Sequence, residues 1–195
     1  MSIDIKFDAN QKYQRDAIDS AVDLFAGQEL LQQGVALPAL DDEMVLEGFE
    51  HLVFGNSLSL TPETMQANLR RVQDREVLTE AGESVLAVPE GLRNELGIDD
   101  LPLDFSVEME TGTGKTYVYL RTIAELNQKY GFTKFLIVVP SVAIREGVVS
   151  SLRLLHDHIR EIYDGLQYDS YVYDSNALTR VRQFATSSHL QIMVI

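Results

Sequence analysis

The stretch from Phe105 to Leu120 reads "FSVEMETGTGKTYVYL" and sets a β-prone run, a glycine-rich loop and a helical pattern in direct succession. In the motif G-x-x-x-x-G-K-[ST], consecutive backbone N–H groups curl around phosphates, and small residues leave the approach open. Gly114, Lys115 and Thr116 fit the last three positions of this motif, and Gly112 is a further small residue in the loop. The stretch therefore predicts a strand over residues 105–109, a phosphate-binding loop, and a helix from Lys115.

The loop also predicts roles for two of its side chains, those of Lys115 and Thr116. Lys115 is expected to reach the β- and γ-phosphates of a nucleotide, and Thr116 to place its hydroxyl on Mg²⁺. Met109 stands where the motif has its first glycine, so the match fails at one position. The predicted phosphate site comprises Thr111, Gly112, Thr113, Gly114, Lys115 and Thr116. The plainer alternative is a tight turn followed by a solvated lysine.

The composition is that of a globular protein, with 195 residues of which 45% are hydrophobic and 24% charged. It has no cysteine, which excludes disulfides and thiolate metal sites. No run approaches the roughly 18 apolar residues of a membrane span, and the N-terminus lacks the apolar core of a secretory signal. We therefore expect a cytoplasmic protein without a membrane partner.

The net charge of −14 is confined to the first half of the chain. Residues 1–106 contain 21 acidic and 7 basic side chains, whereas residues 107–195 contain 9 of each. A contact with DNA in the second half would therefore depend on local Lys and Arg side chains and not on a global field.

The order of predicted elements indicates an α/β fold. After residue 104, strands at 105–109, 134–140, 169–174 and 190–195 alternate with helices at 115–131, 141–163 and 176–188. This order predicts a parallel sheet covered by helices on both faces, with ligands beyond the carboxyl ends of the strands. The continuous apolar runs at 134–140 and 190–195 predict fully buried strands.

The first half is less regular. Residues 13–28 predict an amphipathic helix and residues 62–78 another, between stretches rich in turn residues. We divide the chain into an N-terminal helix (1–27), an acidic, mainly helical insertion (28–104) and a nucleotide-binding domain (105–195). The acidic insertion is expected to face solvent or a partner protein, because its charge repels a DNA backbone.

Three stretches together resemble one family. Met109 followed by "ETGTGKT" resembles the loop of superfamily 2 helicase-like translocases, in particular the restriction (Res) subunits of type III restriction-modification enzymes. "YQRDAI" at 13–18 resembles the segment whose glutamine reads adenine in these proteins, which implies that role for Gln14. "FLIVVPSVAIREGV" at 135–148 resembles their motif Ia, which implies DNA-backbone contacts for Ser141 and Arg145.

This resemblance implies a P-loop, RecA-like helicase domain 1 that uses ATP and Mg²⁺, acts on double-stranded DNA, and assembles with a methyltransferase (Mod) subunit. A glutamine amide has the donor and the acceptor that adenine N7 and N6 require. The family's acidic Walker B motif would follow the strand at 190–195, where this sequence stops. The resemblance therefore implies an N-terminal part of an ATP-dependent restriction endonuclease, which we expect to be inactive alone.

Two other classes of function stay open from the sequence. One is a P-loop kinase of small metabolites, although the strand at 134–140 stands where a kinase would need a lid over its acceptor. The other is a non-catalytic nucleotide-binding or protein-docking module. Gln14 also suits a surface helix, Ser141 a plain helix N-cap, and Arg145 a solvated helix face.

Overall fold

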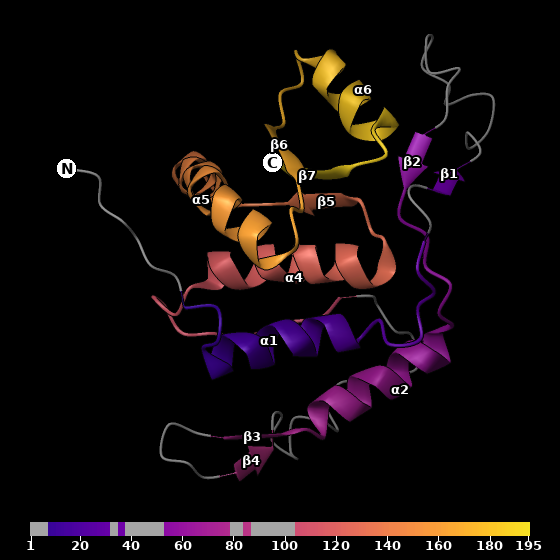
Figure 1. Ribbon diagram of the computed structural model, residues 1–195, viewed down its shortest axis with the longest axis vertical. Helices are drawn as coiled ribbons and strands as arrows, with labels where there is room; N and C mark the ends of the chain where they lie inside the picture. The colour runs from indigo at the N-terminus through magenta and orange to yellow at the C-terminus, as the bar shows by residue number, and fades with distance from the viewer. Residues whose placement is uncertain (1–7, 32–34, 38–52, 79–83, 87–103) are drawn as a thin grey trace. The chain divides into compact units, whose positions relative to one another are not determined.

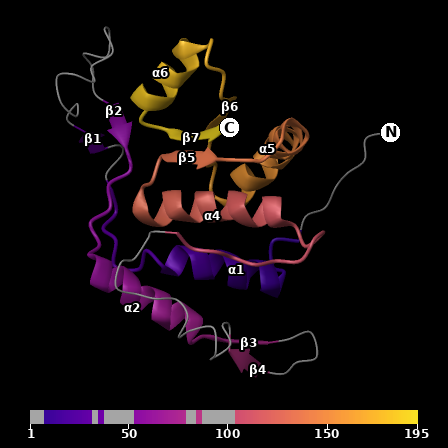
Figure 2. The same ribbon diagram turned by 180° about the vertical axis from the view of Figure 1, so that it is seen from behind.

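The computed structural model describes residues 8–31, 35–37, 53–78, 84–86 and 104–195. They divide into two compact units, one of Met1–Gln28 with Ser59–Val118 and the other of Glu29–Leu58 with Tyr119–Ile195. The bounds of these units differ from the three segments predicted from the sequence, and that division stays a prediction. Figures 1 and 2 show the elements from opposite sides.

The first unit contains two amphipathic helices, α1 (Lys12–Asp23) and α2 (Pro62–Gln73). The buried side chains of α1 follow one another at intervals of four, and those of α2 at three and four. Thr61 caps α2, since its hydroxyl accepts a hydrogen bond from the Thr64 N–H, and Pro62 occupies the first helical position.

Polar side chains join these two helices. The Asn68 amide on α2 donates hydrogen bonds to the carbonyls of Leu24 and Ala26, at 2.9 and 2.8 Å, just beyond the end of α1. The Arg75 guanidinium lies 2.6 Å from the Asp23 carboxylate. The carbonyls at the end of a helix lack intrahelical partners, so the Asn68 amide stabilises the end of α1 as well as the contact between the helices.

Two short antiparallel strand pairs occur in the span predicted to be the acidic insertion. β1 (Val35–Leu37) pairs with β2 (Val53–Gly55), and β3 (Glu76–Leu78) pairs with β4 (Ser84–Leu86). The helix predicted over 62–78 was too long, because its last residues form β3 and their backbone groups bond to β4 instead. The remainder of the span at 38–52, 79–83 and 87–103 lies outside the described residues.

The second unit is built on a parallel sheet of three strands in the order β5-β7-β6. These strands are β5 (Lys134–Ile137), β6 (Tyr168–Val172) and β7 (Leu190–Val194). Every residue of β7 is buried, as its continuous apolar run predicts. The register sets Lys134, Gln191 and Asp169 side by side, and so on one face of the sheet.

Helices cover both faces of this sheet, as the alternation of elements predicts. α5 (Val142–Ile162) lies on the face of Tyr168, whose hydroxyl donates to the Leu152 carbonyl at 2.7 Å. α6 (Leu178–Thr186) lies on the other face, where the Phe184 ring is 5.5 Å from the Lys134 amine. Figures 1 and 2 show α5 and α6 on opposite sides of the strands. α4 (Lys115–Tyr130) begins in the first unit and continues into the second.

Two predictions about strands were wrong. Residues 104–110 form no strand and have no strand partner among the described residues, and alternating residues alone do not hold a strand without a neighbour to bond. The second wrong prediction is that β5 is fully buried: among the described residues β5 is an edge strand that pairs with β7 alone. Leu136 is 58% exposed and Val138, just beyond β5, is 73% exposed.

Within the described residues, no helix has the length and apolar character needed to cross a bilayer.

Candidate nucleotide site

The glycine-rich loop adopts the backbone conformation that its two glycines allow. Gly112 has a φ of 86° and Gly114 a φ of 85°, values that residues with a Cβ rarely adopt. Among the described residues, Asp164 is the sole non-glycine with a positive φ, so Met109 does not need the freedom of glycine. The departure from the motif at Met109 is therefore compatible with the loop.

Met109 contributes to the loop through its backbone. Its carbonyl and that of Glu110 each accept a hydrogen bond from the Lys115 amine at 2.8 Å. The Glu110 carbonyl also accepts from the Thr113 hydroxyl at 2.7 Å. Any residue supplies a carbonyl, which gives a physical reason why methionine is tolerated at this position.

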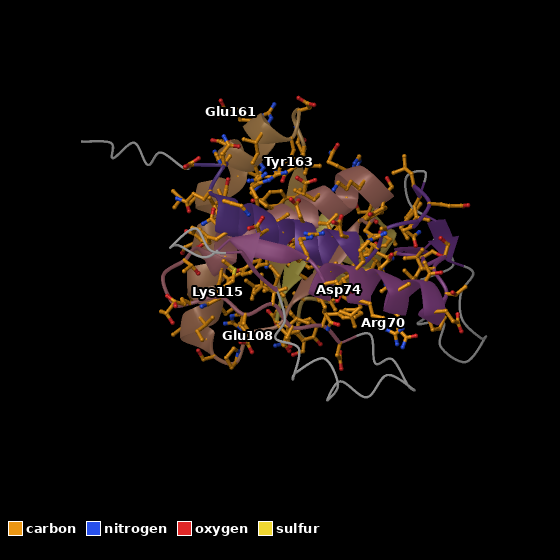
Figure 3. The ribbon with its side chains drawn as sticks, turned by 90° about the horizontal axis from the view of Figure 1, so that it is seen from below. Arg70, Asp74, Glu108, Lys115, Glu161 and Tyr163 are labelled. Atoms are coloured by element: carbon orange, nitrogen blue, oxygen red, sulfur yellow. The ribbon has the colours of Figure 1, made fainter. Side chains whose placement is uncertain are left out.

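Lys115 is the first residue of α4 and is exposed. It is labelled in Figure 3. The N–H groups in the first turn of a helix have no intrahelical partners, and with the helix dipole they favour an anion. A positive side chain and backbone N–H donors thus occur together at the start of α4. These residues fit a phosphate group.

Gln14 lies against this loop. Its side chain is 7% exposed, and its Nε2 donates a hydrogen bond to the Thr113 carbonyl at 2.9 Å. Its Oε1 is buried and has no hydrogen-bond partner among the described residues. A Cβ added at Gly114 would come within 2.7 Å of Nε2. The structure therefore brings Gln14 together with the loop, and Gln14 is not the surface helix residue of the plainer interpretation.

The remaining residues of the predicted loop site are placed along the same segment. Thr111 is exposed in the turn, and Thr116 is half-buried in the first turn of α4. Within the described residues, no group of three or more His, Asp or Glu side chains is arranged to hold a metal ion.

Ser141 and Arg145 lie at the start of α5 in the second unit. Ser141 is the N-cap of this helix, and its hydroxyl accepts from the Ile144 N–H at 3.3 Å. The Arg145 Nε is buried and lies 3.6 Å from the Glu146 carboxylate, and it has no hydrogen-bond partner in the part of the chain that the structure describes. Ser141 thus has the N-cap geometry of its plainer interpretation, and its hydroxyl takes up one of the first-turn N–H groups of α5.

A buried polar cluster that the sequence did not reveal joins α4 to the end of α5. The Tyr163 hydroxyl accepts from the Arg121 Nε and donates to the Glu125 carboxylate, each at 3.0 Å. Burial raises the pKa of Tyr163 to about 12. Burial, and then the positive charge of Arg121, lower the pKa of His158. The sequence does place Arg121 and Glu125 four residues apart on one helix, which predicts an ion pair between them. It could not show that both bond to Tyr163, which lies 38 residues after Glu125.

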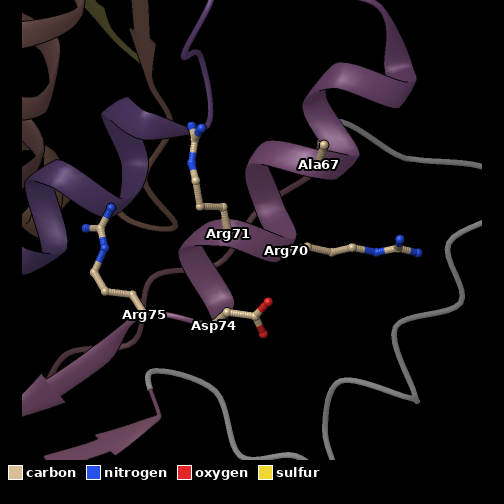
Figure 4. Close-up of a pocket in the computed structure, with 5 residues that line it drawn as sticks. All are labelled: Ala67, Arg70, Arg71, Asp74 and Arg75. Atoms are coloured by element: carbon tan, nitrogen blue, oxygen red, sulfur yellow. The ribbon is translucent and has the colours of Figure 1, made fainter.

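Two hollows lie away from the loop. One, of about 690 Å³, is lined by Ala67, Arg70, Arg71, Asp74 and Arg75 on α2. Figure 4 shows Arg71 and Arg75 extending to one side of α2 and Arg70 to the other, so these cations do not converge on one ligand. The second, of about 500 Å³, lies at the amino ends of the strands of the second unit, and its lining includes Thr133, Gln167 and His189.

Comparison with known proteins identifies the relatives of the chain. A family model described as "Type III restriction enzyme, res subunit" matches residues 57–194. The Res subunit of the type III restriction-modification enzyme EcoPI, from Escherichia phage P1, is 29% identical over 177 residues, which cover 90% of this chain and 16% of the relative. The EcoP15I Res subunit of Escherichia coli is 29% identical over 165 residues, 84% of this chain and 14% of the relative.

A third relative matches a shorter stretch at higher identity. The StyLTI Res subunit of Salmonella typhimurium is 44% identical over 68 residues, which cover 34% of this chain and 7% of the relative. The chain therefore spans about a sixth or less of the length of the curated relatives that it matches.

The parallel sheet with helices on both faces, and the glycine-rich loop ahead of α4, define an α/β protein of the helicase-like class with a partial RecA-like fold. The family model covers well over half of the chain, so the chain belongs to the family of Res subunits of type III restriction enzymes. The resemblance found in the sequence is confirmed.

Proposed function

We propose that this chain binds an adenine nucleotide with Mg²⁺ at Gln14 and the loop from Thr111 to Thr116. The observation that carries the proposal is the contact between the Gln14 Nε2 and the Thr113 carbonyl, which joins a candidate base-reading amide to a phosphate-type loop. The free Oε1 of Gln14 supplies an acceptor for the adenine amino group. Guanine has a carbonyl oxygen at that position, which the Oε1 would repel.

Different residues of the loop are proposed to contact different parts of the nucleotide. The Lys115 amine exchanges its two carbonyl contacts for the β- and γ-phosphates, and the backbone donors at the start of α4 hold the remaining oxygens. Thr116 would hold the metal through its hydroxyl. The Mg²⁺ carried with the nucleotide would supply positive charge that offsets the charge of the phosphates.

We further propose that the chain is part of an ATP-dependent DNA translocase and endonuclease subunit that acts in the cytoplasm with a methyltransferase (Mod) partner. The membership of the Res family and the relatives' names as restriction-modification enzymes support this proposal. Ser141 and Arg145 are proposed to contact the DNA backbone. The proposal is supported by the position of both residues at the start of α5 and by the Arg145 Nε, which has no hydrogen-bond partner among the described residues.

The nucleotide proposal is tested by isothermal titration of the chain with ATP and GTP in the presence of Mg²⁺. We expect ATP to bind more tightly than GTP. Lys115→Ala should weaken ATP binding by about 10- to 100-fold, because hydrogen bonds to charged groups are worth about 1.5–3 kcal/mol. Lys129→Ala, at the far end of the same helix, is the matched control and should bind ATP as the wild type does.

Equal affinity for ATP and GTP would contradict the adenine assignment. If Lys115→Ala instead lowered the melting temperature of the nucleotide-free protein by several degrees and left ATP binding intact, Lys115 would be a structural residue.

The DNA proposal is tested by binding of duplex DNA over a range of salt concentrations. Arg145→Ala should weaken binding to all sequences alike and lower the slope of log K against log salt by about 1, as expected for the loss of one phosphate contact. Arg153→Ala, an exposed position on the same helix, is the control. An unchanged salt slope in Arg145→Ala would contradict a phosphate contact.

A further inference from the structure

The Gln14 carboxamide is positioned to make more than one kind of contact. One hydrogen of its Nε2 is bonded to the Thr113 carbonyl at 2.9 Å. The other has only a long contact of 3.4 Å, to the hydroxyl of Tyr13, whose side chain is about half exposed. The Oε1 of the same amide is buried, and no described residue offers it a hydrogen bond. A ligand therefore finds one acceptor and one weakly used donor on Gln14 while the bond to Thr113 stays in place.

The bond to Thr113 has a consequence for the phosphate loop. A peptide unit is planar and trans, so its C=O and the next residue's N–H point in opposite directions. A hydrogen bond that holds the Thr113 carbonyl toward Gln14 therefore directs the Gly114 N–H away from Gln14. That N–H belongs to the row of backbone donors available to phosphate at the start of α4.

The surroundings of this peptide leave few other ways to hold it. Gly114 has a positive φ, and because glycine has no Cβ its backbone can also adopt other φ values. The Gly114 backbone by itself therefore does not hold the peptide in one orientation. The Thr113 side chain bonds to the Glu110 carbonyl and fixes the preceding turn, but it does not fix the Thr113–Gly114 peptide. Gln14 Nε2 lies close enough that a Cβ at Gly114 would meet it at 2.7 Å.

We infer that Gln14 is a positioning residue of the phosphate loop as well as a reader of the base. One hydrogen of its amide orients the Thr113–Gly114 peptide, and its remaining donor and acceptor serve the adenine. The inference rests on the proposed nucleotide site. It follows that Gln14 contributes to the binding of a polyphosphate that carries no base.

The test compares ATP with inorganic triphosphate, each with Mg²⁺, in titrations of the wild type, Gln14→Met and Gln66→Met. Methionine nearly matches the shape of glutamine and removes the donor and the acceptor. Gln66, half-buried on α2 away from the loop, is the control for the same change. We expect Gln14→Met to weaken triphosphate binding by about 2- to 10-fold, the loss of one neutral hydrogen bond, and to weaken ATP binding by more.

The outcomes separate the two proposals. If Gln14→Met weakens ATP but binds triphosphate as the wild type does, Gln14 reads the base alone, so this inference is wrong while the nucleotide site stands. A wild type that binds neither ligand overturns the nucleotide site and this inference together. The melting temperature without ligand should be similar in the three proteins, which distinguishes positioning from a general loss of folding.

A measurement on the wild type covers the case in which Gln14→Met does not fold. The side-chain amide signals of Gln14 in a ¹⁵N–¹H spectrum should shift when inorganic triphosphate is added. The reason is that Gln14 is bonded to the carbonyl of the peptide whose N–H, that of Gly114, would donate to the phosphate. Signals that do not move at saturating triphosphate would overturn the inference.

Discussion

Two glycines in one loop differ in what surrounds them, although their backbone angles are nearly the same. Gly112 and Gly114 have φ values of 86° and 85°. A Cβ at Gly112 would meet nothing within 4 Å, whereas one at Gly114 would meet the Gln14 amide. The first glycine is needed for its backbone conformation alone, and the second also for the space it leaves.

This difference predicts unequal effects of alanine at the two positions. Gly112→Ala should destabilise the protein by about 1–2 kcal/mol, the cost of a left-handed conformation for a residue with a Cβ. Gly114→Ala should cost more, because its Cβ also displaces the buried Gln14 side chain. Urea unfolding followed by circular dichroism measures both. A larger loss for Gly112→Ala than for Gly114→Ala would show that the Gln14 contact is not tight in solution.

At the scale of elements, the edge strand β5 is held by a side chain from another part of its unit. The Asn56 Oδ1 accepts from the N–H groups of Thr133 and Lys134, at 2.8 and 3.1 Å, and its Nδ2 donates to the Lys134 carbonyl at 2.7 Å. One amide thus takes the place of a neighbouring strand at the start of β5. This contact protects backbone groups that an edge strand otherwise leaves open to other chains.

Asn56→Ala should therefore destabilise the second unit by about 1–3 kcal/mol, since the Thr133 N–H is left buried without its acceptor. The measurement is amide hydrogen exchange, in which the Thr133 and Lys134 N–H groups should exchange faster in the variant. Gln183→Ala, at an exposed position on α6, serves as the control and should leave these amides unchanged. Equal exchange rates in Asn56→Ala and the wild type would refute the proposed stabilisation.

At the scale of the whole molecule, Lys134, Tyr163 and Tyr168 contribute to the pH dependence of stability in alkaline solution. Burial lowers the pKa of Lys134 to about 8, and the amine donates to the Ser187 carbonyl. Burial raises the pKa values of Tyr163 and Tyr168 to about 12. All three groups belong to the second unit.

The sign of each effect follows from the protons bound in each state. Between about pH 8 and 10, Lys134 is protonated in the unfolded chain and neutral in the folded one, so the free energy of unfolding rises with pH. Above about pH 10 the tyrosines lose protons in the unfolded chain but keep them in the folded one, so the free energy falls. We therefore expect the contribution of these three groups to the free energy of unfolding to be largest near pH 10.

Lys134→Met should remove the rise between about pH 8 and 10 and leave the fall above about pH 10 unchanged. Urea unfolding at a series of pH values measures this, with the wild type as reference. A wild type whose stability does not increase over that range relative to the variant would show that Lys134 titrates near its ordinary pKa in the folded protein.

Local interactions explain why much of this structure was predictable. The helices follow from apolar residues spaced three and four apart, and β7 from a continuous apolar run. The loop follows from two glycines at positions that require a positive φ, next to a lysine that begins a helix. These features depend on neighbours along the chain, so the amino-acid order alone was enough to establish the α/β class, the loop and the family.

Contacts between distant residues decided the rest. Residues 105–109 have the alternating pattern of a strand but do not pair with any described strand. β5 is partly exposed because the order β5-β7-β6 leaves it at an edge. The hydrogen bond from Gln14 to Thr113 spans 99 positions of sequence. A strand exists only when another segment offers its backbone, and a side chain reaches a loop only when folding brings them together, so neither could be read from residue order.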